Sequence, residues 1–539
     1  MQDCSQLTRC FAVGGLSGLV VATRLSEDAS KSVIVLEAGP DATNNANVTT
    51  PAYETMLTAT ELDWNLTTVA QKHVQNRTMM YQQGHGLGGG SLVNYMAYSR
   101  GAPSVFDVWA RTTGDESWAW SKLAHYFNKA THFHKPQSKG VTIQTHDNLY
   151  RNARGPIDVS YPRTQENFAS YFVAAFRNST HGGPGLPIID YNAGESIGVA
   201  YHSMSIAPRT ATRASTASAY LPLLKGRRNV RVVTGARVDT LTMAKKRATG
   251  VLYTDILLLL AGIGPRDHLG SLGIPVVEDL PGVGSNAQDH VFPSLTYEVV
   301  SSIDTTAQWL NETYFTELKD DYRKDKNGTL DSDLGGAQAT ERVPDALLKQ
   351  WNASYHLSLP HDQNNIQYLF DSTLFGQPTN TKNIVTVVPV LVTPESRGTV
   401  RLGSRDPSQP ALYDPNYLDS MADRRIIQWG FHRLRDAMRS DALRSIRVGE
   451  YTPGNNVTSS EDVMDAITQS LATIHHVCGT AAMGPKSKGG VVDEKLRVYG
   501  TEGLRVVDAS LFPTIPTTQI QSAVYAAAEK AADIIKAAP

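Results

Sequence analysis

The sequence predicts an α/β fold, α+β overall, in which a Rossmann-like domain is interrupted by an inserted antiparallel sheet. Residues 11–37 read as a strand, a glycine turn, a helix and a second buried strand, which is the pattern of a βαβ unit. Residues 383–392 and 398–402 alternate apolar with other residues, as strands of an antiparallel sheet do. Residues 423–440 and 523–535 have the apolar spacing of helices, and the second is rich in alanine.

Length, charge and composition narrow the class of protein. At 539 residues the chain has room for about three domains, or two large interwoven ones. Its 50 Lys and Arg against 52 Asp and Glu argue against binding to nucleic acid or to an anionic membrane surface. The longest strongly apolar stretch, residues 256–263, is far too short to span a membrane. We therefore expect a large globular protein of enzyme size, with no nucleic-acid or membrane partner.

The cysteines and asparagines bear on metal binding and localisation. Three cysteines cannot form a disulfide framework, and no Cys-x-x-Cys pair indicates zinc, so no metal site is predicted. Eight Asn-x-Ser/Thr sequons favour the secretory pathway, although no signal peptide is visible in the first residues. We expect a secreted protein or, failing that, a cytoplasmic one. The sequons begin at Asn47, Asn65, Asn76, Asn178, Asn311, Asn327, Asn352 and Asn456.

The first glycine turn is expected to hold a pyrophosphate. The helix of the βαβ unit begins near Ser17, where free backbone N–H groups and the helix dipole favour an anion. At Gly15 and Gly18 the absence of a Cβ lets the backbone approach a phosphate. Glu37 lies 19 residues after Gly18, the spacing at which an acid meets a ribose hydroxyl. These features predict a dinucleotide-binding turn, whereas a lone glycine motif also occurs in ordinary tight turns.

This motif departs from its usual form at one position. Counted back from Gly18, the pattern Gly-x-Gly-x-x-Gly finds Gly15 and then Val13 in place of the first glycine. Residues 1–10 are also too polar for the leading edge of a buried strand. Either one residue is missing between Val13 and Gly14, or the turn is altered.

A second glycine cluster lies at residues 84–94. Four consecutive small residues, Gly88 to Ser91, let the backbone pack against a flat ring or a phosphate. Leucine and valine residues beside them anchor the segment to a core, which argues against a merely flexible loop.

A third cluster, residues 475–484, opens with His475 and His476. An imidazole titrates near neutrality and can take a hydroxyl proton, so one of the two is a candidate acid–base group. Taken alone, either histidine also suits a structural role. A zinc site is not expected here, because neighbouring positions seldom project towards one metal ion.

These clusters and further motifs resemble the glucose–methanol–choline (GMC) family of FAD-dependent oxidoreductases, particularly its fungal members. The matches keep their order and run nearly from end to end of the chain. They are the glycine turn with Glu37 and residues 84–94, 109–111, 118–120, 213–220, 261–265, 280–290, 476–480, 489–493 and 504–510.

The resemblance implies an FAD domain of the glutathione-reductase type and a substrate domain whose sheet covers the isoalloxazine ring. Residues 1–290 would be mainly FAD domain, with substrate-domain segments around residues 105–185. Residues 291–450 would be mainly substrate domain. Residues 451–539 would return to the FAD domain and carry the catalytic histidine.

The same resemblance implies which residues bind FAD. The glycine turn and Glu37 would hold the ADP half, the second glycine cluster would lie along the pyrophosphate and flavin, and Val238 would face the adenine. Asp508 and Ala509 would meet the pyrophosphate and ribityl chain. The full set is Gly15, Leu16, Ser17, Gly18, Glu37, Gly88, Gly89, Gly90, Ser91, Asn94, Val238, Asp508 and Ala509.

Catalysis would fall to His476 and Gln519 by this resemblance. His476 lies where the family keeps its catalytic base, and it would take the proton of an alcohol while the carbon-bound hydride passes to flavin N5. Gln519 lies six residues before Tyr525, where the family has His or Asn. A neutral amide can orient a substrate hydroxyl or the flavin but cannot share a proton, so His476 would be the base alone.

Near residue 254 the sequence is shorter than the family pattern. After residues 250–254 the family has a hairpin, a strand of the FAD-domain sheet, a turn and part of a helix, about 25 residues by the usual size of such elements. Here Asp255 leads directly into residues 256–265. We hypothesise that the chain derives from a splice form or gene prediction that lost segments at both places. Such a loss is expected to leave a gap or edge in the sheet and a partly exposed FAD site.

Three functions are compatible with these features. The first is oxidation of an alcohol (a CH–OH donor) by an FAD-dependent oxidase or dehydrogenase with oxygen or another acceptor, in a setting such as fungal secondary metabolism. The second is a non-redox cyclisation or dehydration with structural FAD. The third is a catalytically impaired member that persists as a glycoprotein or binding scaffold. The sequence leaves the substrate and the oligomeric state open.

Overall fold

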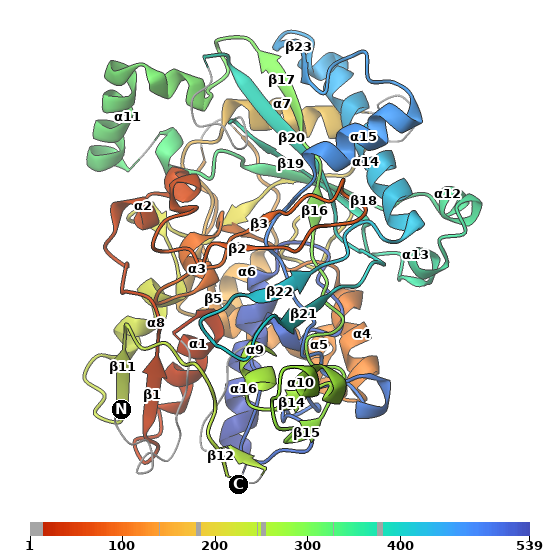
Figure 1. Ribbon diagram of the computed structural model, residues 1–539. Coiled ribbons are helices and arrows are strands. Elements are labelled where there is room, and N and C mark those ends of the chain that lie inside the picture. The colour runs from red at the N-terminus through yellow and green to blue at the C-terminus, as the bar shows by residue number, and fades with distance from the viewer. Residues whose placement is uncertain are drawn as a thin grey trace.

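The computed structural model describes residues 14–138, 141–178, 185–244, 246–248, 255–326, 328–373 and 381–538. A large antiparallel sheet lies in the upper part of the molecule in Figure 1, and helices packed on short strands form the lower part. The helices nearest the two chain ends, α1 and α16, both lie in the lower part. The predicted leading strand at residues 11–13 falls outside the described residues.

The large sheet has eight strands, and every pair in it is antiparallel. Its order is β23-β17-β20-β19-β18-β7, and β16 pairs with both β20 and β24. This arrangement confirms the antiparallel sheet that the alternating segments predict. The strands are β7 (Gly198–Tyr201), β16 (Val291–Phe292), β17 (Leu295–Val299), β18 (Ala337–Glu341), β19 (Ile366–Asp371), β20 (Ile384–Leu391), β23 (Arg447–Thr452) and β24 (Ala472–Thr473).

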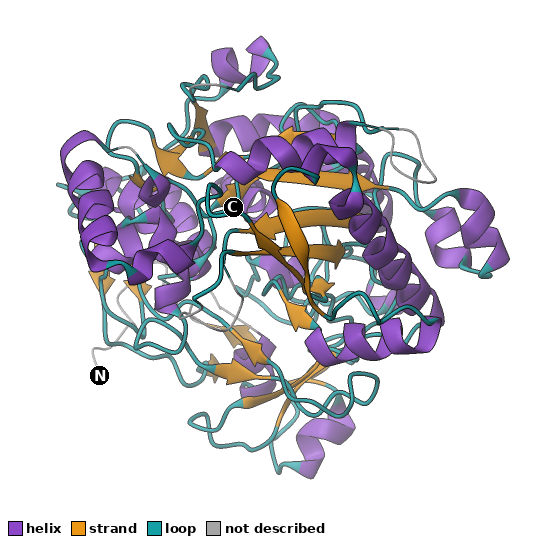
Figure 2. Ribbon diagram, turned by 90° about the horizontal axis from the view of Figure 1, so that it is seen from above, coloured by secondary structure: helices purple, strands orange, loops and turns teal. Residues whose placement is uncertain are grey.

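The two faces of this sheet have different neighbours. Because side chains alternate along a strand, Tyr368 and Phe370 point to one face of β19, and Gln367 and Leu369 point to the other. The two aromatic side chains belong to a core shared with helices, which Figure 2 shows packed around the long strands. Leu369 packs instead in a small apolar cluster that includes Ile474, next to the predicted catalytic segment. The helices of the first face are α7 (Asn167–Arg177), α14 (Met421–Arg439) and α15 (Ser460–Ser470).

Helix α1 (Leu16–Leu25) is the centre of the lower part. Most of its side chains are buried, and it packs against α8 (Thr216–Leu224) and α16 (Gln521–Ala537). Strands β1 (Val33–Leu36) and β11 (Val230–Val233) pair in parallel beside it. The helix and second strand of the predicted βαβ unit are therefore present.

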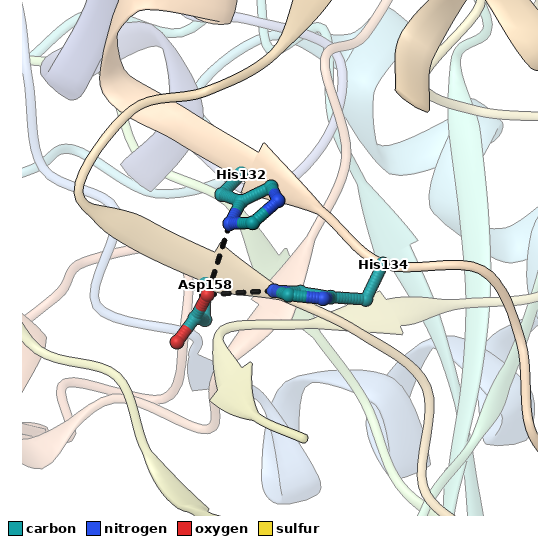
Figure 3. Close-up of side chains that lie close together, drawn as sticks. All are labelled: His132, His134 and Asp158. Carbon is teal, nitrogen blue, oxygen red and sulfur yellow. Dashed lines mark hydrogen bonds and ion pairs between the residues drawn. The ribbon is translucent and has the colours of Figure 1, made fainter. Parts of the chain in front are cut away.

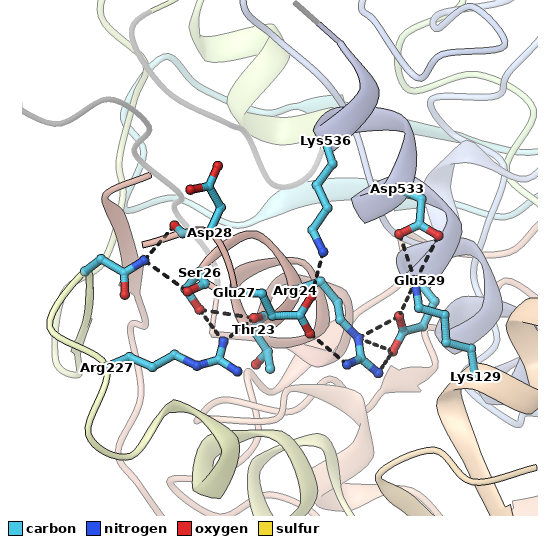
Figure 4. Close-up of polar contacts among 11 residues, drawn as sticks. Thr23, Arg24, Ser26, Glu27, Asp28, Lys129, Arg227, Glu529, Asp533 and Lys536 are labelled. Atoms are coloured by element: carbon cyan, nitrogen blue, oxygen red, sulfur yellow. Dashed lines mark hydrogen bonds and ion pairs between the residues drawn. The ribbon is translucent and has the colours of Figure 1, made fainter. Parts of the chain in front are cut away.

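A buried ion-pair network joins α1 to α16 (Figure 4). The guanidinium of Arg24 donates to both carboxylate oxygens of Glu529 at distances of 2.8–3.0 Å. The Glu529 side chain has no exposed surface, and Lys129 lies 3.4 Å from it. The Tyr220 hydroxyl donates to the same carboxylate at 2.8 Å. Since a buried charge is tolerated only when it is paired and hydrogen-bonded, this network fixes the first and last helices to each other.

The predicted shortening near residue 254 falls partly outside the described residues. The apolar run that follows it forms helix α9 (Asp255–Leu260) and continues into β14 (Ile263–Gly264). Strand β14 pairs in parallel with β15 (Glu278–Asp279), apart from the β1–β11 pair. Within the described residues, these parallel strands thus form separate two-stranded ladders rather than one wide sheet.

One segment differs from the expectation. The composition of residues 311–341 is polar and predicts a loop-rich stretch, but these residues contain helix α11 (Glu312–Asp325), so that prediction is wrong. The Asn311 side chain accepts hydrogen bonds from the first-turn N–H groups of Thr313 and Tyr314, which caps the helix. A mostly exposed helix of this kind lacks the wide apolar stripe from which a helix can be predicted in a sequence.

The remaining elements connect the two parts. The predicted strand at residues 398–402 forms β21, which pairs with β22 outside the large sheet. Along the described chain, no helix combines the length and apolar character needed to cross a membrane. These elements are α2 (Ala46–Thr49), α3 (Gly90–Val93), α4 (Pro103–Thr113), α5 (Trp120–Ala130), α6 (Asp147–Asn152), α10 (Arg266–Ser271), α12 (Asp345–Gln350), α13 (Ser354–Ser358), β2 (Leu66–Thr67), β3 (Met80–Tyr81), β4 (Ala97–Tyr98), β5 (Thr131–Phe133), β6 (Ile157–Val159), β8 (Ser203–Met204), β9 (Ile206–Ala207), β10 (Thr212–Arg213), β12 (Met243–Ala244), β13 (Arg247–Ala248), β21 (Thr399–Leu402) and β22 (Ala411–Asp414).

Candidate active site

The first glycine turn ends at the N-terminus of α1. Gly15 is the N-cap residue, and no side chain caps the helix there. The N–H groups of the first turn, at Leu16, Ser17 and Gly18, are therefore placed to receive an anion. This uncapped helix N-terminus is compatible with the phosphate position that the sequence predicts.

Glu37 lies directly against this turn. Its carboxylate accepts hydrogen bonds from the backbone N–H groups of Gly39, at 2.9 Å, and of Gly14. A Cβ on Gly14 would lie 2.6 Å from the Glu37 side chain, so only glycine fits there. Burial raises the pKa of the Glu37 carboxyl above its ordinary value, although these backbone donors oppose the shift. The acid is thus held at the end of β1 next to the turn.

The second glycine cluster packs onto the first. The Gly88 N–H donates to the Gly14 carbonyl at 2.7 Å. Gly89 has a φ of +50°, and a Cβ on it would lie 2.9 Å from the Cα of Gly15. A Cβ on Gly90, by contrast, would meet no described heavy atom within 4 Å. The two clusters therefore form one glycine cradle with open space beside Gly90, and such a cradle fits the pyrophosphate of a dinucleotide.

Ser91 and Asn94 connect the second glycine cluster to other segments of the fold. The Ser91 hydroxyl donates to the Gly88 carbonyl at 2.7 Å and accepts from the Thr216 N–H at 3.0 Å. The Asn94 side-chain oxygen accepts from Arg213 at 2.7 Å, and its amide donates to Gln521 at 3.2 Å. The segment is therefore tied to α8 and to the start of α16.

Three further predicted residues lie apart from the cradle in sequence. Asp508 caps a short helical turn by accepting the Ser510 N–H at 2.9 Å. Ala509 accepts from the Gly479 N–H at 3.2 Å, so this turn runs beside the segment that follows His476. Val238 is half-buried and packs on the core of the lower part. The structure thus brings Asp508 and Ala509 next to the segment that follows His476 and leaves Val238 on a separate loop.

His476 is held by Asp289 and His290. Its backbone N–H donates to the Asp289 carboxylate at 2.8 Å, and the same carboxylate accepts from the Thr473 hydroxyl at 2.6 Å and from Tyr417. The Nδ1 atom of the His476 ring lies 2.9 Å from Nδ1 of His290. His476 keeps some accessible surface, whereas its partner His290 is fully buried.

The contacts of His290 determine the protonation of His476. The Nε2 atom of His290 lies 3.1 Å from the Val392 carbonyl, which can only accept, so Nε2 carries a hydrogen. Burial lowers the pKa of His290 to about 3, so the ring is neutral and its Nδ1 has no hydrogen. Nδ1 of His476 must then donate to it. Burial, with help from His290 and His475, lowers the pKa of His476 well below its ordinary value, which leaves Nε2 of a neutral ring with a free lone pair.

His475 has a different role. Its Nδ1 accepts the backbone N–H of Gln82 at 3.2 Å, and its ring contacts Tyr81 of β3. Burial lowers its pKa to about 4. Of the two adjacent histidines, His475 is therefore bound to the segment at β3, and His476 is bound to His290.

Gln519 lies in a buried group of polar side chains. Its Oε1 accepts from the Ser99 hydroxyl at 2.9 Å, from Thr518 at 2.8 Å and from Gln367 at 3.4 Å. Its Nε2 donates back to Gln367, on the face of the large sheet opposite the aromatic core. The Pro516 carbonyl, in the same segment, contacts His290. The structure thus brings Gln519 to the sheet face, with its amide bound to protein partners.

Asp289 and His290 received no role from the sequence. They end the motif at residues 280–290, but nothing local indicates that their partners are Tyr417, Thr473 and His476. The signal available in the sequence was an adjacent Asp-His pair directly before the strand that begins at Val291. Burial raises the pKa of Asp289 to about 6, against the hydrogen bonds that it accepts.

Comparison with known proteins agrees with this geometry. Family profiles described as GMC oxidoreductase match residues 9–256 and 394–528. The chain is 33% identical to the dehydrogenase pkfF of Emericella nidulans, over 97% of this chain and 92% of that protein. It is 32% identical to the patulin synthase of Aspergillus clavatus, over 96% and 90%.

A solved structure leads to the same conclusion. An FAD-dependent oxidoreductase from Chaetomium thermophilum superposes with a TM-score of 0.88 at 27% identity, over 98% of this chain and 99% of that one. The glycine cradle described above fits such a cofactor, and FAD is the cofactor of this fold. The chain belongs to the GMC oxidoreductase family.

Proposed function

We propose that the protein is an FAD-dependent oxidoreductase that oxidises an alcohol, with His476 as the catalytic base. The observation that carries this proposal is the pair of imidazoles at 2.9 Å, because it leaves Nε2 of His476 unprotonated. A neutral imidazole in this state can accept the hydroxyl proton of a bound alcohol.

The residues of the glycine cradle would hold the cofactor. Gly15 and the N–H groups of α1 would bind its pyrophosphate, and Glu37 would bind a ribose hydroxyl. Bound FAD supplies the acceptor for the two electrons that leave the alcohol carbon. His476 receives the proton at Nε2, and His290 holds the ring in the tautomer that makes this possible.

The face of the sheet opposite the aromatic core would bound the substrate. Near His476 this face is apolar, with Val388, Val390 and Val392 in one cluster with Leu369 and Ile474. Further along, Gln367 is bound to Gln519. An apolar wall beside a single base favours a largely apolar alcohol. The likeness to two patulin synthases supports a place in fungal secondary metabolism.

The test is to express the chain, quantify bound flavin and mix the loaded protein anaerobically with a panel of alcohols. Bleaching of the visible flavin band by one alcohol, and reoxidation by oxygen or a dye acceptor, is the expected result. Flavin that no alcohol bleaches, with a substrate cyclised or dehydrated instead, would replace redox catalysis by a non-redox role. Protein that binds no flavin would overturn both.

A further inference from the structure

Strands β5 and β6 place three metal-ligating side chains on one outer face. The two strands run in parallel, with His132 opposite Asp158. His134 continues the ladder, since its N–H donates to the Val159 carbonyl at 2.9 Å. It follows His132 by two residues, so both imidazoles point to the same side.

The opposite face of these strands is fixed in the core. Phe133, Ile157 and Val159, the alternate positions, are buried. Phe133 packs edge-on against Tyr98, with ring centroids 5.7 Å apart. The backbone that carries the three ligating residues is therefore held in place by packing rather than by the polar groups themselves.

The three side chains already converge (Figure 3). His134 Nε2 lies 2.6 Å from Asp158 Oδ1, and His132 Nδ1 lies 3.6 Å from the same oxygen. One ligand atom from each residue lies within 4.8 Å of the other two. Tetrahedral coordination at the usual zinc bond lengths separates ligand atoms by about 3.3 Å, which lies inside this range. Small side-chain rotations therefore suffice to enclose an ion.

We propose that His132, His134 and Asp158 bind one divalent transition-metal ion of the zinc type. Two imidazole nitrogens and one carboxylate oxygen are a common ligand set for such ions, whereas Mg²⁺ and Ca²⁺ prefer oxygen ligands alone. The side chains are about one-third exposed, at 38%, 27% and 34%, so an ion can enter from solvent and water can complete its coordination.

Two opposite charges act on the site. Arg154, next to β6, acts on His132 with a positive charge, and the Asp158 carboxylate opposes it. A bound ion would replace the hydrogen bond between His134 and Asp158 and link β5 to β6. The linked segments follow α5 and precede α7, and they include no residue assigned above to the cofactor or to proton transfer.

Zinc titration of the flavin-loaded protein, after treatment with a chelator, tests the site. Calorimetry is expected to show one tight site in the wild type. His134→Gln and Asp158→Asn each remove a ligand, and each should weaken that site by more than the tenfold to hundredfold typical of residues that only orient a ligand. His73→Gln is the matched control, because His73 forms a similar exposed pair with Asp419 at 3.1 Å and should leave zinc binding unchanged.

A thermal readout separates loss of binding from loss of folding. Zinc should raise the Tm of the wild type and of the His73→Gln protein and leave the Tm of the two ligand variants unchanged, while all four melt together in chelator. Wild-type zinc affinity in both ligand variants, or no tight site in the wild type, would overturn the proposal.

Discussion

The Nδ1 atoms of His290 and His476 lie 2.9 Å apart, so one imidazole must donate to the other. The Val392 carbonyl determines which of the two rings is the donor, because it accepts the single ring N–H of a neutral His290. Two residues that are 186 positions apart thereby set the location of a single proton. Several measurable consequences depend on this arrangement.

Replacing the base removes catalysis and leaves the cofactor in place. His476→Gln is expected to lower kcat/KM by roughly 10²–10⁴-fold, the usual contribution of a general base. Flavin content should be unchanged, since the glycine cradle lies on other segments. Steady-state kinetics with the alcohol found in the panel and a visible spectrum measure both. His475→Asn, which keeps an acceptor for the Gln82 N–H, is the control; equal losses in the two variants would contradict the assignment.

Two replacements of His290 distinguish positioning from packing. Asparagine can place an acceptor oxygen near the former Nδ1, whereas alanine cannot. His290→Ala is therefore expected to lower kcat/KM by about tenfold or more, and His290→Asn by clearly less. The two proteins should melt at similar temperatures. If asparagine and alanine give the same rate and the same pH profile, His290 does not orient His476.

The pH profile follows from the lowered histidine pKa values. His476 accepts a proton only when neutral, and its pKa lies well below the ordinary 6.5. The values for His290 and His475, about 3 and about 4, keep those rings neutral as well. As pH falls, kcat/KM should therefore stay level through 6.5 and decline only in more acidic solution.

Asp289→Asn identifies the group behind that decline. The Asp289 carboxyl has a pKa of about 6, and the amide cannot titrate. If His476 sets the acid limb, the limb stays below 6.5 in the variant as in the wild type. A wild-type limb at or above 6.5 that Asp289→Asn leaves in place would show that His476 is not shielded as described.

Gly90→Ala probes the space that the cofactor would fill. The added methyl meets no described atom within 4 Å, so the flavin-free protein should be as stable as the wild type. If FAD occupies that space, the methyl costs about 1–3 kcal/mol of binding, or roughly five- to 150-fold in affinity. Flavin titration measures it. Gly270→Ala, in α10 and equally unobstructed, should bind FAD normally.

Arg24→Met tests the link between the chain's first and last helices. Removing the guanidinium leaves the buried Glu529 carboxylate short of a partner, which is expected to destabilise the fold by roughly 3–5 kcal/mol. Calorimetric melting measures the change. Arg323→Met breaks an exposed pair with Asp320 and should change stability by no more than about 1 kcal/mol. Equal effects would show that the Arg24 pair is no stronger than a surface contact.

The elements with strong local patterns were predictable from the sequence. The helix and strand around the first glycine turn, the long strand β20 and the last helix α16 each show their own apolar spacing. Helix α11 was missed because most of its residues are polar and its apolar stripe is narrow, consisting of Phe315, Leu318 and Tyr322, which pack on a small core cluster. The period and spacing of apolar residues were enough to predict the elements around the glycine turn, β20 and α16, but not α11.

Contacts between distant segments were not predictable in the same way. His476 stood out because an unusual pair of histidines marks it, whereas His290 becomes meaningful only after the fold brings the two together. The same applies to His132 and Asp158, which become neighbours through the register of two parallel strands. No spacing within one element carries that information.

The pairing of Arg24 with Glu529 also has a consequence for biosynthesis. The two residues are 505 positions apart, so at typical synthesis rates α1 would wait roughly 25–100 s for its partner to be made. During that time α1 lacks the helix α16 against which it packs in the folded protein. Flavin is therefore expected to load onto the released polypeptide rather than the nascent one, and messages truncated before α16 should yield colourless protein that depends on chaperones.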